Sequence, residues 1–226
     1  MRHTPISAVG EGRRTYRLVP FGADAPAPVR DLSRLHSTLL PASPVALLGA
    51  PFMEWFYYRW LPADGLMVGA IAYVDGNPAG FVAATPDSAG FMRLAVRRRW
   101  LRLLTAMTLT VTLRPGAVRS LLAAARVLRE RKPTMSAQSL GEILSMGVLE
   151  EYRTQRFVAE SGLRLSLDLL DHAVRRLQAG GVGAIRAVVA ADNPQAKLLY
   201  SGLGWTLNRT DVPEWRTPTV EFVWRA

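Results

Sequence analysis

The C-terminal half of the chain alternates between short apolar runs and helical repeats, and this alternation restricts the fold more than any other feature. Residues 142–148 (EILSMGV) and 184–190 (AIRAVVA) are short runs of the kind that form buried strands. Between them, apolar residues recur at steps of four and three from Leu163 to Leu177, which predicts a long amphipathic helix that Gly180-Gly181 ends. A strand, a helix and a second strand in this order predict two neighbouring parallel strands.

The second apolar run leads directly into another helix. Asn193 is a suitable N-cap and Pro194 suits the first helical position, so a short helix is expected to about Leu199. Gly204-Trp205 then leads into a strand, and residues 217–224 are expected to form the last strand.

The N-terminal part predicts further strands and helices. Alternation over 15–20 predicts a strand, and apolar spacing predicts helices over 26–40 and 51–61. Strands over 65–74 and 79–84 flank a tight-turn signal and form a hairpin. We therefore expect a loose tail over 1–13 and a single domain over 14–226, with the order β-α-α-β-β-(insert)-β-α-β-α-β-β. The fold class is α/β (α+β), a mixed sheet flanked by helices.

The positive charge of the chain is confined to one segment. Residues 91–132 hold eleven basic side chains and one acidic one, Glu130, so their net charge of +10 equals that of the whole chain. We interpret this segment as a helical basic insertion, although the run 108–113 (TLTVTL) fits an extended strand equally well.

Composition excludes several kinds of site. The chain has no cysteine, which rules out disulfides, Cys-based zinc sites and a thiol nucleophile, and fits a reducing compartment. Its three histidines are scattered, so no metal is expected. No apolar stretch suits a signal peptide or reaches eighteen residues, so we expect no transmembrane helix and a cytoplasmic protein.

One stretch carries a family resemblance. Residues 192–205 (DNPQAKLLYSGLGW) resemble the signature of the GNAT N-acetyltransferase superfamily, in which N-x-x-A-x-x-L-Y-x-x-x-G and an aromatic residue follow a short apolar strand. Residues 142–153 look like the central strand of that family and the entry to its pyrophosphate loop. In overall layout the chain is also similar to acetyltransferases found with polysaccharide synthesis. The resemblance implies a GNAT-like sheet that is splayed at its centre.

The resemblance also implies an acetyl-CoA site. The backbone of Met146, Gly147 and Val148 would bind the pantetheine arm, with Met146 and Val148 as the hydrogen-bonding partners. Asn193 would contact the same arm, and the Tyr200 hydroxyl would protonate the leaving thiolate. Taken singly, Asn193 also fits a simple helix cap, and Tyr200 also fits a half-buried aromatic residue on an amphipathic helix.

The pyrophosphate loop departs from the family pattern. The family loop reads R/Q-x-x-G-x-G/A, but here Arg153 is followed by nine residues before the helix, with Gly162 at the last glycine position. Either Arg153 or Arg156 replaces the backbone contacts by direct charge pairing, or the phosphate site is degraded. For the general base we select Glu142, which begins the central strand; a surface carboxylate is the alternative identity.

The basic segment has three interpretations. It is a solvated helical pair, a surface that docks on an anionic membrane at the inner face of the cell, or a nucleic-acid site, which ranks last because few aromatic residues interleave with the arginines. It could also wall off the acceptor pocket. The leading hypothesis is an N-acetyltransferase that uses acetyl-CoA and a small-molecule or saccharide amine acceptor, such as an amino sugar. The alternatives are a catalytically silent acyl-CoA-binding module and a membrane-surface anchor; a homo-oligomer is compatible with each.

Overall fold

The computed structural model describes residues 14–113, 140–210 and 218–226. The predicted tail over 1–13 and the second half of the basic segment lie outside these residues. Seven strands form one mixed sheet in the order β1-β2-β3-β4-β5-β7-β6. The strands are β1 (Tyr16–Phe21), β2 (Val68–Val74), β3 (Asn77–Thr85), β4 (Leu140–Val148), β5 (Ala184–Ala190), β6 (Thr206–Arg209) and β7 (Thr219–Arg225).

Most strand pairs are antiparallel. The β2–β3 hairpin turns at Asp75-Gly76, where both residues have positive φ, and this conformation explains the turn signal in the sequence. The exception is β4 with β5, which run parallel because helix α8 connects them. The expected α/β fold, a mixed sheet flanked by helices, is therefore confirmed.

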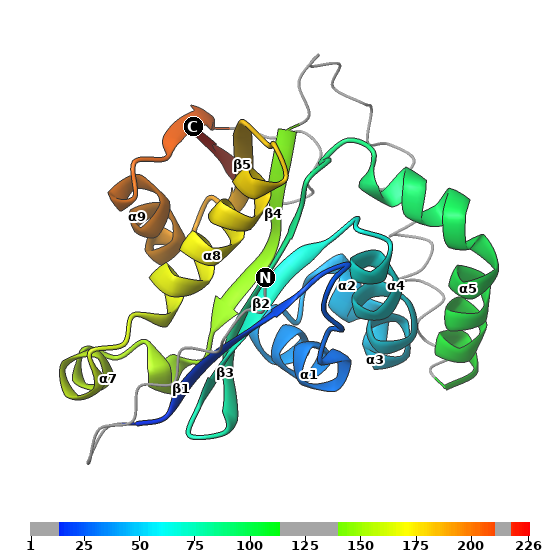
Figure 1. Cartoon of the computed structure of the whole chain (residues 1–226), viewed down its shortest axis with the longest axis horizontal. Helices are drawn as coiled ribbons and strands as arrows, with labels where there is room; N and C mark the ends of the chain where they lie inside the picture. Colours follow the sequence, from blue (N-terminus) through cyan, green and yellow to red (C-terminus); the bar gives the residue numbers. More distant parts are fainter. Residues whose placement is uncertain (1–13, 114–139, 211–217) are drawn as a thin grey trace.

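Helices cover both faces of the sheet (Figure 1). One face carries α1 (Val29–Leu39), α2 (Pro44–Leu47), α3 (Gly49–Phe52), the π-helical segment η1 (Met53–Tyr57), α4 (Tyr58–Ala63) and α5 (Phe91–Leu113). The other face carries α8 (Leu165–Ala179) and α9 (Pro194–Gly202). A short 3-10 turn, η2 (Glu150–Tyr152), and α7 (Gln155–Ser161) lie between β4 and α8.

Each face of the sheet has its own apolar core. On the α1 face, Tyr58, Phe56 and Phe81 are completely buried. On the α8 face, Leu169, Val82 and Ile185 are completely buried. Successive strand residues point to opposite faces, so Phe81 and Val82 supply different cores from one strand. This assignment of faces locates the polar side chains described below.

The start of the basic segment is one long helix. Helix α5 continues through residues 108–113, so the extended alternative for that run is wrong. Arg99 departs from helical geometry, with φ −132° and ψ 30°, and kinks the helix. No helix in the described part of the chain is long and apolar enough to cross a membrane.

Candidate active site

A slot opens in the centre of the sheet between β4 and β5. The two strands pair over only four residues, from Leu140 opposite Ala184 to Ile143 opposite Ala187. Beyond this point β4 continues to Val148 on β3, and β5 continues to Ala190 on β7. The facing edges of the two strands are therefore unpaired beyond Ile143 and Ala187, and the strands diverge.

A bulge lies where the divergence begins. Ala83 of β3 is opposite Ser145 and Ala84 is opposite Ile143, so Leu144 is the extra residue of β4. A bulge bends its strand and increases the local twist. It thus accounts for the departure of β4 from β5 directly after Ile143.

Backbone direction decides which residues can bind in the slot. The Leu149 N–H donates to the Ala79 carbonyl of β3 over 2.8 Å. Because backbone groups alternate in direction along a strand, Val148 and Met146 point theirs away from β3, into the slot. Their role as backbone partners of the pantetheine arm, which the family resemblance implies, stays a prediction. Gly147, grouped with them in the prediction, presents its backbone to β3 instead.

Gly147 has a different importance. A Cβ added there would lie 3.0 Å from Leu39 Cδ1 of α1. The missing side chain lets α1 approach β4 closely beside the slot, so this glycine helps to position the helix.

Helix α9 begins just beyond the end of β5. Asn193 Oδ1 accepts a hydrogen bond from the Ala196 N–H at 3.0 Å, and Pro194 occupies the first turn. The Asn193 N–H also donates to the Ala190 carbonyl at 3.1 Å. The predicted cap is confirmed, and it brings the positive end of α9 and the exposed Asn193 amide next to the β5 side of the slot.

Tyr200 lies on the face of α9 that packs into the core. Its ring stacks on Phe222 with centroids 5.7 Å apart and meets Trp205 edge-on at 4.9 Å. Only 5% of the residue is exposed, and burial raises the pKa of its hydroxyl above the ordinary value, so the group is a neutral proton donor. The hydroxyl makes no hydrogen bond to the residues that the structure describes, and it is therefore available for another partner.

The segment expected to be a long pyrophosphate loop is largely helical. Thr154 Oγ1 caps α7 by accepting the Phe157 N–H at 3.1 Å, and Gly162, with φ +71°, ends it. Gly162 therefore ends α7 before α8 begins at Leu165, and its role in binding pyrophosphate stays a prediction. This helix projects from the body of the protein (Figure 1).

The arginines of this segment point to the surface. Arg156 pairs with Glu160 one turn later at 2.7 Å, and its side chain is 87% exposed. Arg153 follows η2 and is exposed as well. Arg164, which the sequence analysis did not single out, is exposed directly before the first turn of α8. Arg164 lies beside the backbone N–H groups at the start of α8. It is therefore better placed to bind an anion than Arg156, which already pairs with Glu160.

Glu142 lies in a buried ionic cluster. Arg186 Nε and Nη2 donate to Glu142 Oε2 over 3.1 and 2.9 Å, and Ser88 Oγ donates to the same oxygen. Arg186 Nη1 also reaches Glu221 Oε2 at 3.4 Å. Glu142 is only 3% exposed. These contacts give its carboxylate a structural task, and the role as general base stays a prediction.

The other members of this cluster were not predicted from the sequence. Arg186 and Glu221 stand in otherwise apolar strand runs (AIRAVVA and TVEFVW), and both are buried. A charged residue inside a buried strand requires a partner of opposite charge, which is the signal that could have paired them. Ser88 carries no comparable signal because it lies in a loop.

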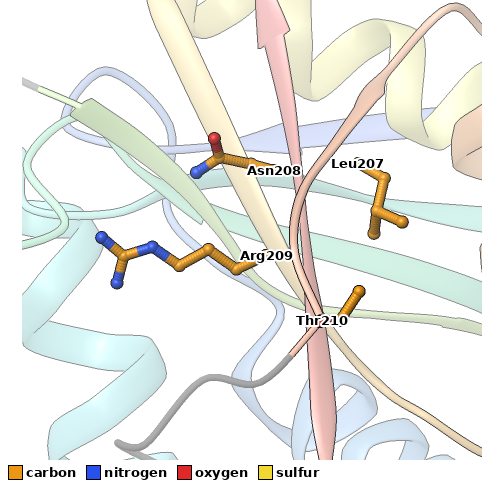
Figure 2. A pocket seen from close by; sticks show the side chains of 4 residues that line it. All are labelled: Leu207, Asn208, Arg209 and Thr210. Atoms are coloured by element: carbon orange, nitrogen blue, oxygen red, sulfur yellow. The ribbon is translucent and has the colours of Figure 1, made fainter.

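A cavity borders the cluster on β6. It has a volume of about 380 Å³ and is lined, among the described residues, by Leu207, Asn208, Arg209 and Thr210. Asn208 and Arg209 extend to the same side of the strand (Figure 2), because the ladder shifts register between Leu207 and Arg209. Asn208 Nδ2 donates to Glu221 Oε1 at 2.5 Å, so the cavity and the buried cluster are joined.

A second polar group lies under the α1 helix. His36 contacts the Tyr58 hydroxyl through Nδ1 at 2.6 Å and Ser43 Oγ through Nε2 at 2.7 Å, and it stacks on Phe81. Burial lowers the pKa of His36 to about 4, so the ring is neutral at pH 7. Burial also raises the pKa of Tyr58 well above its ordinary value, while the nearby Ser145 hydroxyl acts in the opposite direction.

Two buried hydroxyl groups on β4 and β7 make no hydrogen bond of good geometry to the described residues. They are Ser145 Oγ of β4 and Thr219 Oγ1 of β7. Ser145 belongs to the unpaired part of β4, and Thr219 is opposite Ala190 at the end of β5. Buried hydroxyls are normally satisfied, so these two fit a site that takes a polar ligand. The described residues contain no cluster of side chains that could hold a metal ion.

The fold is shared with solved acetyltransferases. Arabidopsis thaliana NAA60 in complex with acetyl-CoA superposes with a TM-score of 0.52 at 16% identity, covering 93% of this chain and 98% of that one. An acetyltransferase of the GNAT family from Streptococcus pneumoniae gives 0.52 at 14% identity over 93% and 99% of the chains. The IAA acetyltransferase from Bacillus cereus gives 0.51 at 10% over 93% and 99%. No protein-family model and no curated protein sequence matches the chain. At these identities the similarity establishes a common fold.

Proposed function

We propose that this protein is an acetyl-CoA-dependent N-acetyltransferase that moves the acetyl group directly to an amine. The observation that carries the proposal is the divergence of β4 from β5 after Ile143 and Ala187, which leaves the backbone of Met146 and Val148 unpaired. The pantetheine arm contains amides and can pair with such an edge as an added strand would. The relative with bound acetyl-CoA, Arabidopsis NAA60, shares the fold that forms this slot.

The reaction needs no covalent enzyme intermediate. The amine nitrogen attacks the thioester carbonyl, the new C–N bond forms, and the C–S bond breaks as the tetrahedral intermediate collapses. Tyr200, which burial keeps protonated, gives its proton to the leaving thiolate, and the amine gives up its own proton to a base or to water. The rate comes mainly from holding the two reactants together.

The acceptor approaches from the α1 face in this proposal. Glu142 and Glu221, which both pair with Arg186, place two carboxylates on that face of the sheet. Carboxylates favour the approach of a protonated amine. An amino sugar is one acceptor that we propose to test, together with peptide N-termini, lysine and polyamines.

A second candidate function has its own supporting observation. The loop that would bind pyrophosphate is replaced by α7, and its Arg156 is engaged with Glu160. A protein that binds acyl-CoA through the slot alone, without turnover, would retain the slot and lose the loop. Arg164 at the start of α8 is the residue that would instead preserve phosphate binding in the enzyme.

Two measurements separate these functions. Titration calorimetry with acetyl-CoA, with CoA and with free pantetheine tests binding, and release of free thiol with a panel of amines tests transfer. The enzyme binds acetyl-CoA and releases thiol with at least one amine, whereas the silent module only binds. If acetyl-CoA does not bind at all, both functions are refuted.

A further inference from the structure

The outer side of α5 carries apolar side chains that the fold leaves uncovered. Trp100, Leu101 and Leu104 are 53%, 61% and 54% exposed, and Val96 on the turn before is 37% exposed. The opposite side of the helix is fixed to the protein, where Phe91, Ala95 and Ala106 are buried in the core of the α1 face. Helix α5 therefore presents a fixed apolar surface at the edge of the molecule (Figure 1).

Arginine side chains surround this surface. Arg93, Arg97, Arg98 and Arg102 are exposed, and α5 contains no acidic residue. Arg93 and Arg97 form no ion pair with the described residues, so their charges are not compensated within that part of the chain. The whole net charge of the protein belongs to the segment that α5 begins.

Contacts at the kink hold α5 in place. Arg99 donates from Nη2 to Asp64 Oδ1 at 2.6 Å and from Nε to Asp64 Oδ2 at 2.9 Å. Its guanidinium and that of Arg102 lie over the Trp60 ring, at 4.7 and 3.9 Å from the centroid. The fork–fork pair with Asp64 ties the middle of α5 to the end of α4, so the outward side chains keep a defined direction.

We propose that α5 docks the protein on an anionic lipid bilayer, with Trp100, Leu101 and Leu104 in the interfacial layer and the arginines on the lipid phosphates. Apolar side chains flanked by arginines are the composition of a helix that lies in a membrane interface. A nucleic acid would use the arginines and leave the two leucines exposed to water. A second copy of the same surface is disfavoured because two sets of arginines would face each other.

Co-sedimentation of the full chain with lipid vesicles tests the proposal. We expect binding to vesicles of phosphatidylglycerol mixed equally with phosphatidylcholine, and none to vesicles of phosphatidylcholine alone. Since each arginine contributes roughly fivefold to partitioning, Arg93→Ala/Arg97→Ala should weaken binding about 25-fold, and ~1 M salt should have a similar effect. Trp100→Ser/Leu101→Ser/Leu104→Ser should abolish binding at every salt concentration.

Two matched controls lie on the far side of the protein. Leu198→Ser removes a leucine of α9 that is 74% exposed, and Arg175→Ala removes an exposed arginine of α8. Both should bind vesicles as the unchanged protein does. All variants replace exposed residues, so their melting temperatures should match that of the unchanged protein.

Several results would overturn the proposal. One is that the protein stays in the supernatant with anionic vesicles at low salt. Another is that the triple serine variant binds as well as the unchanged chain, which would leave only nonspecific attraction between charges. A third is that a duplex DNA competitor removes the protein from vesicles at equal phosphate concentration, with an affinity that the serine substitutions do not alter.

Discussion

Glu142 of β4 and Arg186 of β5 face each other in parallel register, one residue pair before the ladder between their strands ends. The ion pair, at 2.9 Å between Arg186 Nη2 and Glu142 Oε2, spans the only part of the sheet where the two strands touch. It therefore fastens the closed end of the slot. The same side chains also fill a buried site that would otherwise need apolar residues.

Removing the arginine of this pair should destabilise the fold strongly. In Arg186→Met, Glu142 and Glu221 lose the guanidinium that contacts both of them, and breaking a buried ion pair costs about 3–5 kcal/mol of the free energy of unfolding. Urea denaturation at pH 7 measures the change. A loss below about 1 kcal/mol would contradict the burial described for the cluster.

Glu142→Gln distinguishes the structural role of Glu142 from a role as general base. The amide keeps the shape of the side chain, and Arg186 keeps Glu221, so we expect a smaller loss of stability than in Arg186→Met. With the protein still folded, kcat should fall only a few-fold. A general base contributes about 10²–10⁴-fold, so a loss of that size at an unchanged melting temperature would identify Glu142 as the base.

Tyr200→Phe tests the proton donor. The hydroxyl makes no hydrogen bond to the described residues, so stability and acetyl-CoA affinity should stay close to those of the unchanged protein. The rate of thiol release should fall about 10²-fold or more, as expected for loss of a general acid. Because burial raises the pKa of Tyr200, the unchanged enzyme should also show no loss of rate from ionisation of this group between pH 7 and 10. An unchanged rate in Tyr200→Phe removes the residue from the mechanism.

Asn193 can be tested for its two separate tasks. Asn193→Ala removes the cap of α9 and should cost about 1 kcal/mol in the free energy of unfolding. Asn193→Ser keeps an oxygen that can cap the Ala196 N–H but removes the side-chain amide. If the amide contacts the pantetheine arm, the serine variant should retain stability and lose acetyl-CoA affinity in calorimetry. Equal affinity in both variants and the unchanged chain would restrict Asn193 to capping.

His36 should make the protein sensitive to acid. Its pKa is lowered from 6.5 to about 4 by burial, so the unfolded chain binds more protons than the folded one between these values. At pH 7 the His36 ring is neutral in both the folded and the unfolded chain. The free energy of unfolding should decrease as the pH falls, by about 3 kcal/mol in total near pH 4. His36→Gln should be less stable at pH 7 but should lack this part of the pH dependence in urea titrations. The same slope in both proteins would assign the acid sensitivity to other groups.

The sequence predicted the sheet well because its strands and helices have strong local signals. These signals each depend on residues that are close in the sequence: the cap at Asn193, the turn at Asp75-Gly76 and the apolar spacing of α8. The divergence of β4 and β5 came from the family resemblance, and the structure confirms it. The bulge at Leu144 that accompanies it has no local signature.

Long-range contacts explain most of what the sequence did not predict. Ser88, Arg186, Glu221 and Asn208 come together from a loop and three strands, so no spacing along the chain reveals them. The sequence did not predict that Gly162 ends a helix, because a glycine after a polar stretch fits both a phosphate loop and a helix end. Only the cap at Thr154, eight residues earlier, distinguishes these cases.

A long connection joins the neighbouring strands β3 and β4, and its length affects the order of folding. Antiparallel β3 and β4 are adjacent, yet residues 86–139 connect them, 54 residues where a hairpin would use about four. Closing a connection of that length costs about 2 kcal/mol more in chain entropy than closing a hairpin. We therefore expect β1–β3 with α1–α4 to assemble early and the C-terminal strands to join them in a late, slow step. The slot would then form only at the end of folding, when β4 has been added to β3.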